Sequence, residues 1–501
     1  MSSLFRPMAE SAFTVRRLRK SPVLAVICVL AASSVPVRAA DDITEAKIRA
    51  LEQQIELLNA QVQDIKASGA SKYAETKRTL DETPKGSLEN GRPTLKSRDG
   101  KSMVSLRSLV QFDAGHYNQK DAPAGSDLSS GSNFRRARLG VEGTLDQIFD
   151  YSFIYDFGGS GVEGTTISQA YIQYKPLDPL AIRIGAFAPF ASLEDSGGAS
   201  DTIFLERASA VELARGLAGG DGRSAVAITA TGKRYLASFA YTGARAGQSG
   251  AFDEQQGLLG RVAGLIYTDA DTNIVLGGNG TYVFDTADAT AGSSSVPVNT
   301  TFANPPELRV DDTAANGTST SLISTGGISA DSVTQLGLDA AAQWQNLYAE
   351  GGYFHFSADR KGAGPAGSNP EFNGWYTQAS WLLTGESRRY DPARAAFRSP
   401  KPANPLTGAA NGGWGAWEIA ARYSVLNLND GINRSTASGG IRGGEQDIWT
   451  FGANWYPNNA LRFSLNYLLI DIDRLAQGSA APFTHISQEI QAVALRTQAS
   501  F

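Results

Sequence analysis

The sequence of 501 residues contains one cysteine, three histidines and no long apolar run. The cysteine, Cys28, lies in an N-terminal segment that we expect to be removed, which excludes disulfides and thiolate chemistry from the mature chain. His116, His355 and His485 are scattered and lack the spacing of metal ligands. We therefore expect no metal site, no cofactor and no catalytic residue. Because no run of about 18 consecutive apolar residues occurs, the sequence encodes no helical membrane span.

Charge and composition narrow the class further. The chain is 19% charged and 42% hydrophobic, contains 53 glycines and carries a formal net charge of −5. It is too long for one ordinary soluble domain. Its short alternating runs, together with abundant Gly, Tyr and Trp, favour β structure. The slight acidity argues against nucleic acid as a partner.

The N-terminus has the three parts of a secretory signal. A basic region around Arg16–Lys20 precedes the apolar stretch Val23–Ala32, which is too short to span a membrane. The small residues Val37 and Ala39 mark a cleavage site before Ala40. We predict that residues 1–39 are a signal peptide and that the mature chain is exported. An exported, cysteine-free, glycine-rich β protein indicates a Gram-negative outer membrane.

An unbroken three- and four-residue spacing of apolar side chains predicts a helix over residues 40–67. The spacing gives the a/d seam of a coiled coil over about three heptads, formed by Ile48, Leu51, Ile55, Leu58, Val62 and Ile65. β-branched residues at a and mostly Leu at d favour a dimer, although a membrane body could set the stoichiometry. The pattern also fits a solitary amphipathic helix at a barrel mouth. Residues 68–101, rich in Ser, Gly, Lys and Pro, are predicted to form a flexible linker.

Residues 102–501 are predicted to form an all-β body, a transmembrane antiparallel β-barrel. In Asn133–Leu145 alternate side chains are apolar and charged. The apolar face carries Ala137, Leu139, Val141 and Leu145, and the other face carries Arg136, Arg138 and Glu142. A soluble sheet would bury its apolar face, whereas a transmembrane barrel turns that face to lipid and the charges to a water-filled lumen.

The rest of the chain repeats this pattern. Many runs of about ten residues alternate in the same way and carry aromatic residues near their ends, which is typical of a membrane barrel. The last run, Gln491–Phe501, is an amphipathic strand ending in Phe, similar to the assembly signal of bacterial outer-membrane barrels. Three long segments read as loops, Gly185–Gly222, Asp285–Asp331 and Pro392–Gly413, and we expect them on the extracellular side.

Sorting the charged strand residues by face makes the lumen positive. The basic residues predicted to face it are Arg107, Arg136, Arg138, Arg183, Arg422, Arg462 and Arg496, with Arg261 as a further candidate. The acidic residues on that face are Asp113, Glu142, Asp156, Asp339 and Glu418. Low-dielectric walls focus such a field and favour anions, and the planar guanidinium group binds phosphate or carboxylate through two bonds. The alternative is that pairs such as Arg136 with Glu142 merely stiffen the wall.

Several segments resemble the phosphate-selective porin O/P family. They include Phe134–Gly140, Phe204–Ala208, Glu307–Asp311, Ser332–Gly337, Trp381–Arg388, Asn454–Asn458 and Leu461–Phe463. The resemblance covers nearly all of residues 102–501. It implies about sixteen strands, a trimer with one channel per subunit, inward-folded loops and an arginine ladder for phosphate. On the matching positions it implies roles for Arg135, Arg136, Arg138, Arg183 and Arg207.

One position departs from the family pattern. Members often carry Gly-Gln-Phe-Lys before the constriction loop, but here the run is Gly185-Ala186-Phe187-Ala188. Ala188 therefore removes a candidate phosphate ligand, for which Arg207, Arg215 and Arg223 could compensate.

The sequence thus predicts an outer-membrane porin for passive diffusion of small anions, and the resemblance implies that these are phosphate or polyphosphate. Its expected partners are membrane lipid, lipopolysaccharide, the permeating anions, two further copies in a homotrimer and, through the coiled coil, the cell wall. Three alternatives remain open, namely a non-selective diffusion pore, a barrel enzyme that acts on lipid or peptide, and a structural tether.

Overall fold

A computed structural model describes residues 38–501 except 90, 121, 123–126, 160–165, 248–250, 292–293, 311–319, 362–368, 408–411 and 476–484. The signal peptide predicted for residues 1–39 lies outside this part apart from its last two residues. The chain forms two compact units, one ending at Asp81 and one starting at Glu82. Each unit is described by itself.

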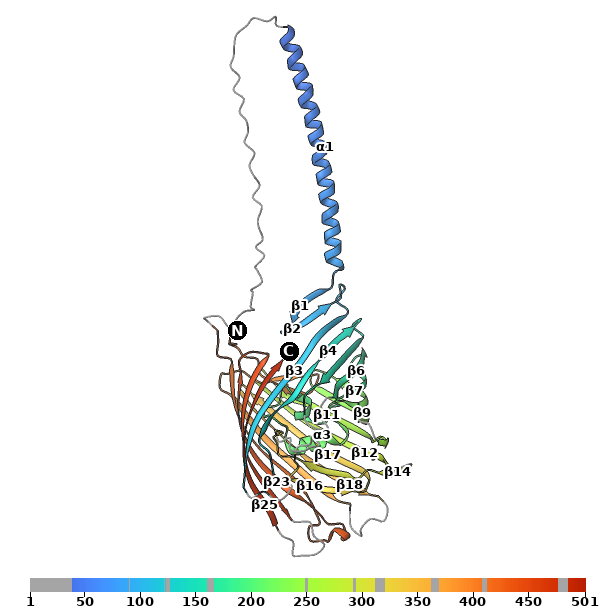
Figure 1. The fold of residues 1–501 in the computed structure, drawn as a ribbon, viewed down its shortest axis with the longest axis vertical. Coiled ribbons are helices and arrows are strands. Elements are labelled where there is room, and N and C mark those ends of the chain that lie inside the picture. Colours follow the sequence, from blue (N-terminus) through green and yellow to red (C-terminus); the bar gives the residue numbers. More distant parts are fainter. Residues whose placement is uncertain are drawn as a thin grey trace, which may run out of the picture. The chain divides into compact units, whose positions relative to one another are not determined.

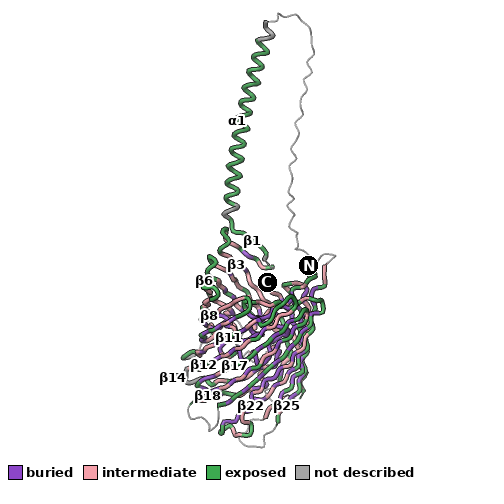
Figure 2. Tube along the Cα trace, turned by 180° about the vertical axis from the view of Figure 1, so that it is seen from behind, coloured by how far each residue is buried: buried purple, intermediate pink, exposed green. Residues whose placement is uncertain are grey.

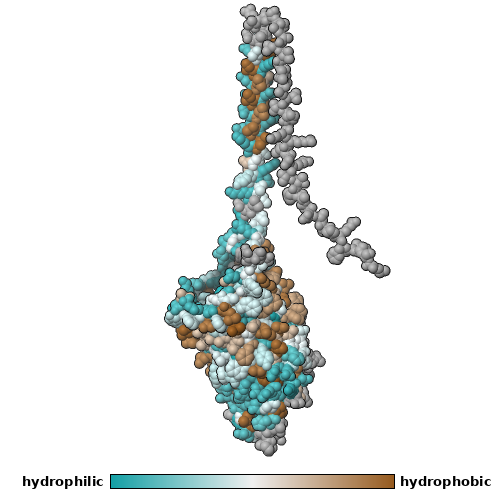
Figure 3. Space-filling model, turned by 90° about the vertical axis from the view of Figure 1, so that its left-hand side faces the viewer, coloured by the Kyte–Doolittle hydropathy of each residue, from teal (hydrophilic) through white to brown (hydrophobic). Residues whose placement is uncertain are grey.

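The first unit is helix α1, Arg38–Glu82, which is 45 residues long. Its apolar stripe, Ile48 to Ile65, is solvent-exposed in the single chain and is visible along the helix in Figure 3. The helix extends well past residue 67, so the flexible linker predicted for residues 68–101 is not what the structure contains. A helix through residue 82 is physically reasonable because this stretch has no proline, whereas Pro84 disfavours helical geometry at the residue before it. Among the described residues, no helix combines the length and apolarity needed to cross a membrane.

The rest of the predicted linker forms a hairpin of β1 (Lys85–Glu89) and β2 (Arg92–Lys96). The hairpin joins the barrel because β2 pairs with the start of the first barrel strand at Thr94 and Ser105. The two hydroxyl groups of these residues lie 2.9 Å apart.

The second unit contains a closed barrel of sixteen antiparallel strands (Figure 1), as predicted. The strands are β3 (Met103–Gln119), β4 (Gly131–Leu145), β5 (Phe149–Asp156), β6 (Thr166–Leu177), β7 (Leu180–Phe187), β8 (Arg223–Thr231), β9 (Tyr235–Arg245), β11 (Gln256–Thr268), β12 (Thr272–Asp285), β17 (Ala330–Trp344), β18 (Leu347–Arg360), β19 (Glu371–Leu382), β22 (Ala416–Asp430), β23 (Ile441–Tyr456), β24 (Leu461–Leu475) and β25 (His485–Ser500). Pairing of β25 with β3 closes the barrel. Closure leaves the spanning strands no unpaired edge, as hydrocarbon requires.

Shorter elements lie between these strands. They are α2 (Leu193–Gly197), α3 (Ser209–Ala218), the 3-10 turn η2 (Thr436–Ser438), β10 (Ala251–Asp253), β13 (Asp288–Ala291), β14 (Ser294–Pro297), β15 (Thr300–Asn304), β16 (Ile323–Ile328), β20 (Arg389–Asp391) and β21 (Ala396–Arg398). α2 and α3 belong to the segment between β7 and β8, and nearly all of their side chains are buried. Figure 1 shows α3 within the barrel.

The alternation of faces is inverted relative to a soluble sheet, as predicted. Along β24, Arg462, Ser464 and Asn466 point inward and are buried, while Leu461, Phe463, Leu465, Tyr467 and Leu469 point outward and are exposed. Figure 2 shows this alternation along the strands, and Figure 3 shows an apolar band on the outer surface. The exposed apolar side chains therefore form the lipid-facing belt.

The inward side chains of β24 form two levels along the lumen. On β24 the polar inward residues lie toward the end with the short turns, whereas Leu468, Ile470 and Ile472 point inward near the long-loop end. These three side chains belong to a buried apolar cluster with residues of α3, including Val211, and with Phe302 of β15. Apolar packing thus holds two inward-folded segments in the long-loop half of the lumen.

One predicted loop lies at the other end. Strands alternate in direction, so residues 383–415, between β19 and β22, start and finish at the short-turn end together with the barrel's termini. In outer-membrane barrels this end is periplasmic. The expectation that Pro392–Gly413 is an extracellular loop was therefore wrong, because it ignored the direction of the preceding strand. Part of this return segment, as we call residues 383–415, enters the lumen, where Phe397 packs on Tyr348 of β18.

The lipid-facing belt predicts that a charged substitution on the outer face lowers the unfolding free energy, and that the loss is larger at the middle of the membrane than at its border. Leu465→Arg places a guanidinium on the lipid face and should lower the unfolding free energy by about 2–4 kcal/mol. Asp471→Arg is the matched control on the same strand and face but beyond the apolar residues, where the cost should be about 0–1 kcal/mol. Urea titration in lipid vesicles measures both. Equal costs would contradict the assignment of the outer face to hydrocarbon.

Candidate permeation site

A polar cavity of about 580 Å³ lies inside the barrel toward the short-turn end. Its walls come from three sources, namely the inner faces of the strands, the return segment and residues 188–222 between β7 and β8, which we call the constriction loop. Basic side chains outnumber acidic ones in the lining. The basic residues are Arg92, Arg107, Arg138, Arg183, Arg207, Arg389, Arg394, Arg398, Lys401 and Arg462, and the acidic residues are Glu142, Asp195, Asp201 and Asp221. The described lining therefore has an excess of positive charge.

Arg183 on β7 is the cavity arginine best placed to meet a solute. Its guanidinium lies 4.4 Å from the ring centre of Tyr171 and 5.2 Å from that of Phe187. Its Nε donates to the amide oxygen of Gln173 at 2.9 Å. In the described part of the chain, no carboxylate forms an ion pair with it. Aromatic stacking thus fixes the orientation of the guanidinium without neutralising its charge.

Most of the other basic side chains that line the cavity form ion pairs with carboxylates. Arg107 lies 3.3 Å from a carboxylate oxygen of Glu142, which Arg92 of β2 also contacts at 2.7 Å. In the return segment, Arg398 lies 3.3 Å from Asp201. These paired side chains shape the cavity more than they charge it.

A similar network spans the constriction loop. Arg138 on β4 bonds Asp156 at 2.7 Å and Asp221 of the loop at 2.6 Å. Arg207 lies 3.4 Å from Asp195 in α2. Burial would disfavour an ionised Asp221, but the nearby guanidinium of Arg138 outweighs that penalty and holds the pKa of Asp221 well below its usual range.

The remaining wall groups hold the constriction loop by its backbone. Residues 201–206 have no strand partner, so their buried carbonyl groups need other donors. Side chains from the wall and the return segment supply them. Arg388 donates to the carbonyl of Asp201 (3.1 Å), Arg462 to Thr202 (2.6 Å), Asn454 to Ile203 (2.9 Å), Arg496 to Leu205 (2.5 Å) and Arg422 to Glu206 (3.0 Å). We call this set the carbonyl clamp.

A buried carboxylate fixes the same segment. Glu206 lies 2.8 Å from Arg135 and 3.1 Å from Arg496, and Arg496 also bonds Asp113 at 2.6 Å. Burial would raise the pKa of Glu206, but the guanidiniums of Arg135 and Arg136 outweigh it and lower that pKa below its usual range. Arg422 is held in the same way by Glu307.

A β-bulge explains how the side chain of Arg135 reaches Glu206. Gln111 faces Arg136 and Phe112 faces Phe134, so Arg135 is the extra residue on β4. Both Arg135 and Arg136 are buried in the lumen as a result. Regular alternation would have turned Arg135 to lipid, and only the family resemblance singled it out.

The nine arginines predicted to bind anions divide into two groups. Those that line the cavity are Arg107, Arg138, Arg183, Arg207 and Arg462. Those outside its lining, buried between wall and constriction loop, are Arg135, Arg136, Arg422 and Arg496. The second group differs from the prediction because each of its guanidiniums bonds other groups of the protein between the wall and the constriction loop. Arg136, for example, donates to Gln111 at 2.8 Å.

Sequence reasoning missed five basic residues of the lining, Arg92, Arg389, Arg394, Arg398 and Lys401. Four of them lie in the return segment, where alternation of faces carries no information. The available signal was the density of basic residues within the proline-rich stretch.

Arg261, the further candidate, donates to the carbonyl groups of Arg394 and Ala395 at 2.8 and 3.1 Å and so anchors the return segment. Among the described residues, no group of His, Cys, Asp and Glu has the arrangement of a metal site.

A closed sixteen-strand barrel with a lipid-facing belt and inward-folded loops defines the class of outer-membrane β-barrel channels. The sequence model of the family described as phosphate-selective porin O and P matches residues 104–501, and the chain belongs to this family. It is therefore a porin of the Gram-negative outer membrane and not an enzyme.

Individual relatives are distant. An uncharacterised protein of Caulobacter vibrioides is 26% identical over 76% of this chain and 71% of its own length. Porin O of Pseudomonas aeruginosa is 24% identical over 79% of this chain and 88% of its own length. A solved structure of an anion-selective porin from Comamonas acidovorans covers 80% of this chain and 100% of its own, at 13% identity and a TM-score of 0.45.

The clamp predicts a coupling between stability and pore size. Arg496→Gln leaves Asp113 buried without its partner, so the unfolding free energy should fall by about 3–5 kcal/mol. Because the carbonyl of Leu205 also loses its donor, single-channel conductance should rise. Urea unfolding and planar-bilayer recordings measure the two effects.

The matched control is Arg434→Gln, which breaks a surface pair with Asp430 (2.8 Å) and should cost less than about 1 kcal/mol. Adding Asp113→Asn to Arg496→Gln should recover part of the stability but not the original conductance. An unchanged conductance in Arg496→Gln would contradict the role of the clamp.

Proposed function

We propose that this porin is a passive channel selective for small anions, with phosphate among them. The observation that carries the proposal is Arg183, a cavity guanidinium that Tyr171 and Phe187 orient and that forms no ion pair with a carboxylate of the described residues. The description of the family, phosphate-selective porin O and P, supports the same class of permeant. No chemical step is involved, because the gradient alone drives the solute.

Selectivity would arise from fixed charge next to a low-dielectric wall. An excess of guanidinium groups lowers the energy of an anion in the cavity and raises that of a cation. Guanidinium binds phosphate oxygens in pairs and is weakly hydrated, so an anion can exchange water for protein contacts at low cost. Ala188 lines the cavity without offering a charge, which leaves Arg183 and the return segment as the main anion contacts.

A non-selective diffusion pore is the competing function, and one observation favours it. The narrow level at the constriction loop contains alternating basic and acidic groups, such as Arg138 with Asp156 and Asp221. A compensated constriction discriminates weakly between signs of charge. The two functions differ in whether Arg183 sets the ion preference of the cavity.

Removing that charge should weaken anion preference. In a KCl gradient across a planar bilayer, Arg183→Gln should lower the chloride-to-potassium permeability ratio about sevenfold, because a unit charge about 7 Å from an ion in water shifts the energies of chloride and of potassium by about 0.6 kcal/mol each, in opposite directions. Inorganic phosphate added on one side should also block chloride current less than in the wild type.

Arg234→Gln is the matched control. Arg234 lies outside the cavity lining and donates to the carbonyl groups of Leu265 and Ile266, so its loss should leave the ratio unchanged. A wild-type channel with no preference for anions would establish the non-selective pore instead.

We also propose that α1 assembles with α1 of further copies, as a parallel bundle in a homotrimer. The exposed apolar stripe supports this, because a helix in water does not leave six layers of Ile, Leu and Val unpaired without cost. Lys47 and Glu52 fall at g and e positions that face each other between parallel helices, which favours this orientation. Copies inserted in one membrane share a direction, so their helices are parallel.

Single cysteines test this assembly in a mature chain that we expect to contain none. Leu58→Cys, at a d position, should give a disulfide-linked pair of chains on a non-reducing gel after mild oxidation. Ala60→Cys, at the outward f position two residues later, is the matched control and should stay uncrosslinked. Equal crosslinking of both variants, or of neither, would contradict the seam.

A further inference from the structure

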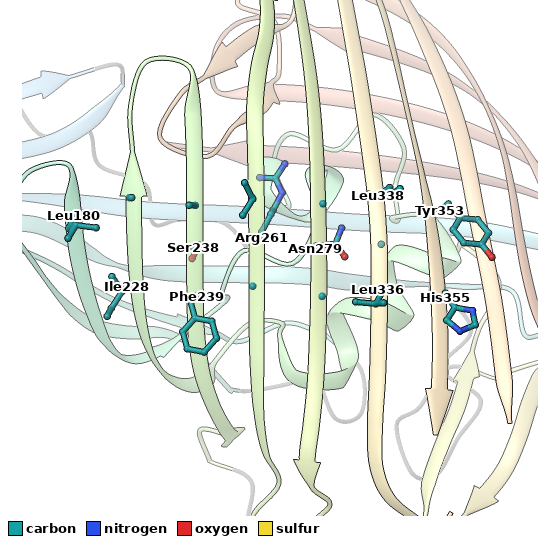
Figure 4. A pocket seen from close by; sticks show the side chains of 17 residues that line it. Leu180, Ile228, Ser238, Phe239, Arg261, Asn279, Leu336, Leu338, Tyr353 and His355 are labelled. Carbon is teal, nitrogen blue, oxygen red and sulfur yellow. The ribbon is translucent and has the colours of Figure 1, made fainter. Parts of the chain in front are cut away.

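An apolar groove of about 1100 Å³ lies on the outer wall of the barrel, on the face opposite the lumen. Phe239 of β9 and Leu336 and Leu338 of β17 point outward and flank it (Figure 4). Val262 of β11, which also lines the groove, is exposed as well. Its floor consists of three outward-facing glycines, Gly260 of β11 and Gly278 and Gly280 of β12. Gly260 and Gly280 are direct partners across the two strands, so the floor is continuous.

The barrel itself does not require glycine at Gly260 or Gly278, whereas a Cβ atom at Gly280 would lie 3.2 Å from Leu336. A Cβ atom at Gly260 would lie 3.6 Å from the carbonyl oxygen of Ser238, its nearest neighbour, and one at Gly278 would lie 3.6 Å from Leu338. Neither residue has a positive φ. Glycine in a strand costs conformational entropy and offers no packing, and its presence often marks the close approach of another molecule. The groove occupies the space that these glycines leave on the outer wall.

The groove is continuous with the lipid-facing belt. Toward the long-loop end the same strand, β12, turns Tyr282 and Phe284 outward, and toward the short-turn end β17 turns Trp344 outward. Outward aromatic residues mark the two borders of the hydrocarbon in such barrels. The groove between them is thus at membrane depth, where hydrocarbon is the solvent.

The polar groups at one edge give the occupant a direction. Tyr353 and His355 of β18 point outward beside Leu338 and Leu336, and His355 is the one nearer the long-loop end (Figure 4). Its Nε2 lies 4.0 Å from Glu371. A phenol and an imidazole at this edge can donate hydrogen bonds to a lipid headgroup, with the acyl chain extending along the glycines. The headgroup would then be in the outer leaflet.

From this combination we infer that the groove binds an acyl chain of an outer-leaflet lipid, the lipid A part of lipopolysaccharide. The site is independent of anion selectivity, because it lies on the opposite face of the wall. It also gives the outward His355 a role that no catalytic or metal pattern supplied.

Filling the groove tests the inference. The mature chain in detergent would be mixed with hexa-acylated lipid A and examined by native mass spectrometry. Gly260→Val with Gly278→Val should retain about tenfold less lipid A than the wild type, because the new side chains take the place of about two buried methylene groups. Bilayer conductance should be unchanged, since the lumen is untouched.

Gly264→Val is the matched control. Gly264 faces outward on β11, is not part of the groove lining, and a Cβ there would have no neighbour closer than 3.9 Å. This variant gains the same strand propensity and should retain lipid A like the wild type. Wild-type retention in the double variant would overturn the inference. So would loss of the oligomer in the double variant, which would assign the groove to a second copy, or equal retention of phosphatidylethanolamine by the wild type, which would assign it to phospholipid.

Discussion

The hydrogen bonds from wall guanidiniums to the backbone carbonyls of residues 201–206 are the interaction on which the pore depends. A barrel of sixteen strands would by itself enclose a wide aqueous channel. What narrows it is an irregular segment with no strand partner, and such a segment is stable inside a protein only if its carbonyl groups are satisfied. Arg462, Arg496 and Arg422 do this at 2.6, 2.5 and 3.0 Å.

The choice of acceptor has an electrostatic consequence. An arginine bound to a carboxylate contributes little field, because the two charges cancel a few ångströms apart. An arginine bound to carbonyl or amide oxygens is fixed just as firmly and keeps its full charge. Arg462, held by Thr202 and Gln498, and Arg183, held by Gln173, are of this second kind and line the cavity. The clamp therefore positions the loop and at the same time supplies part of the positive field.

The sequence was informative wherever the chain is regular. Period-two alternation predicted the inverted barrel and the inward direction of Arg107, Arg183, Arg422, Arg462 and Arg496, because a strand in a closed barrel has only two faces. It could not place Arg135, since a bulge breaks the period. It also could not tell an arginine that meets solute from one that meets a loop, since that depends on the path of residues 188–222 and 383–415. Irregular segments have no period from which to read their contacts.

Two kinds of interaction hold the inward-folded segments, one at each end of the lumen. Near the long-loop end, apolar side chains such as Leu468 and Ile470 pack against the inward-folded segments, and this packing is strong but weakly directional. Toward the short-turn end, the carbonyl clamp is directional and sets the register of residues 201–206. Loss of one clamp residue would thus leave the constriction loop attached by its apolar side and displaced at its polar side. Pore width and ion preference can therefore change through single arginines while the barrel stays intact.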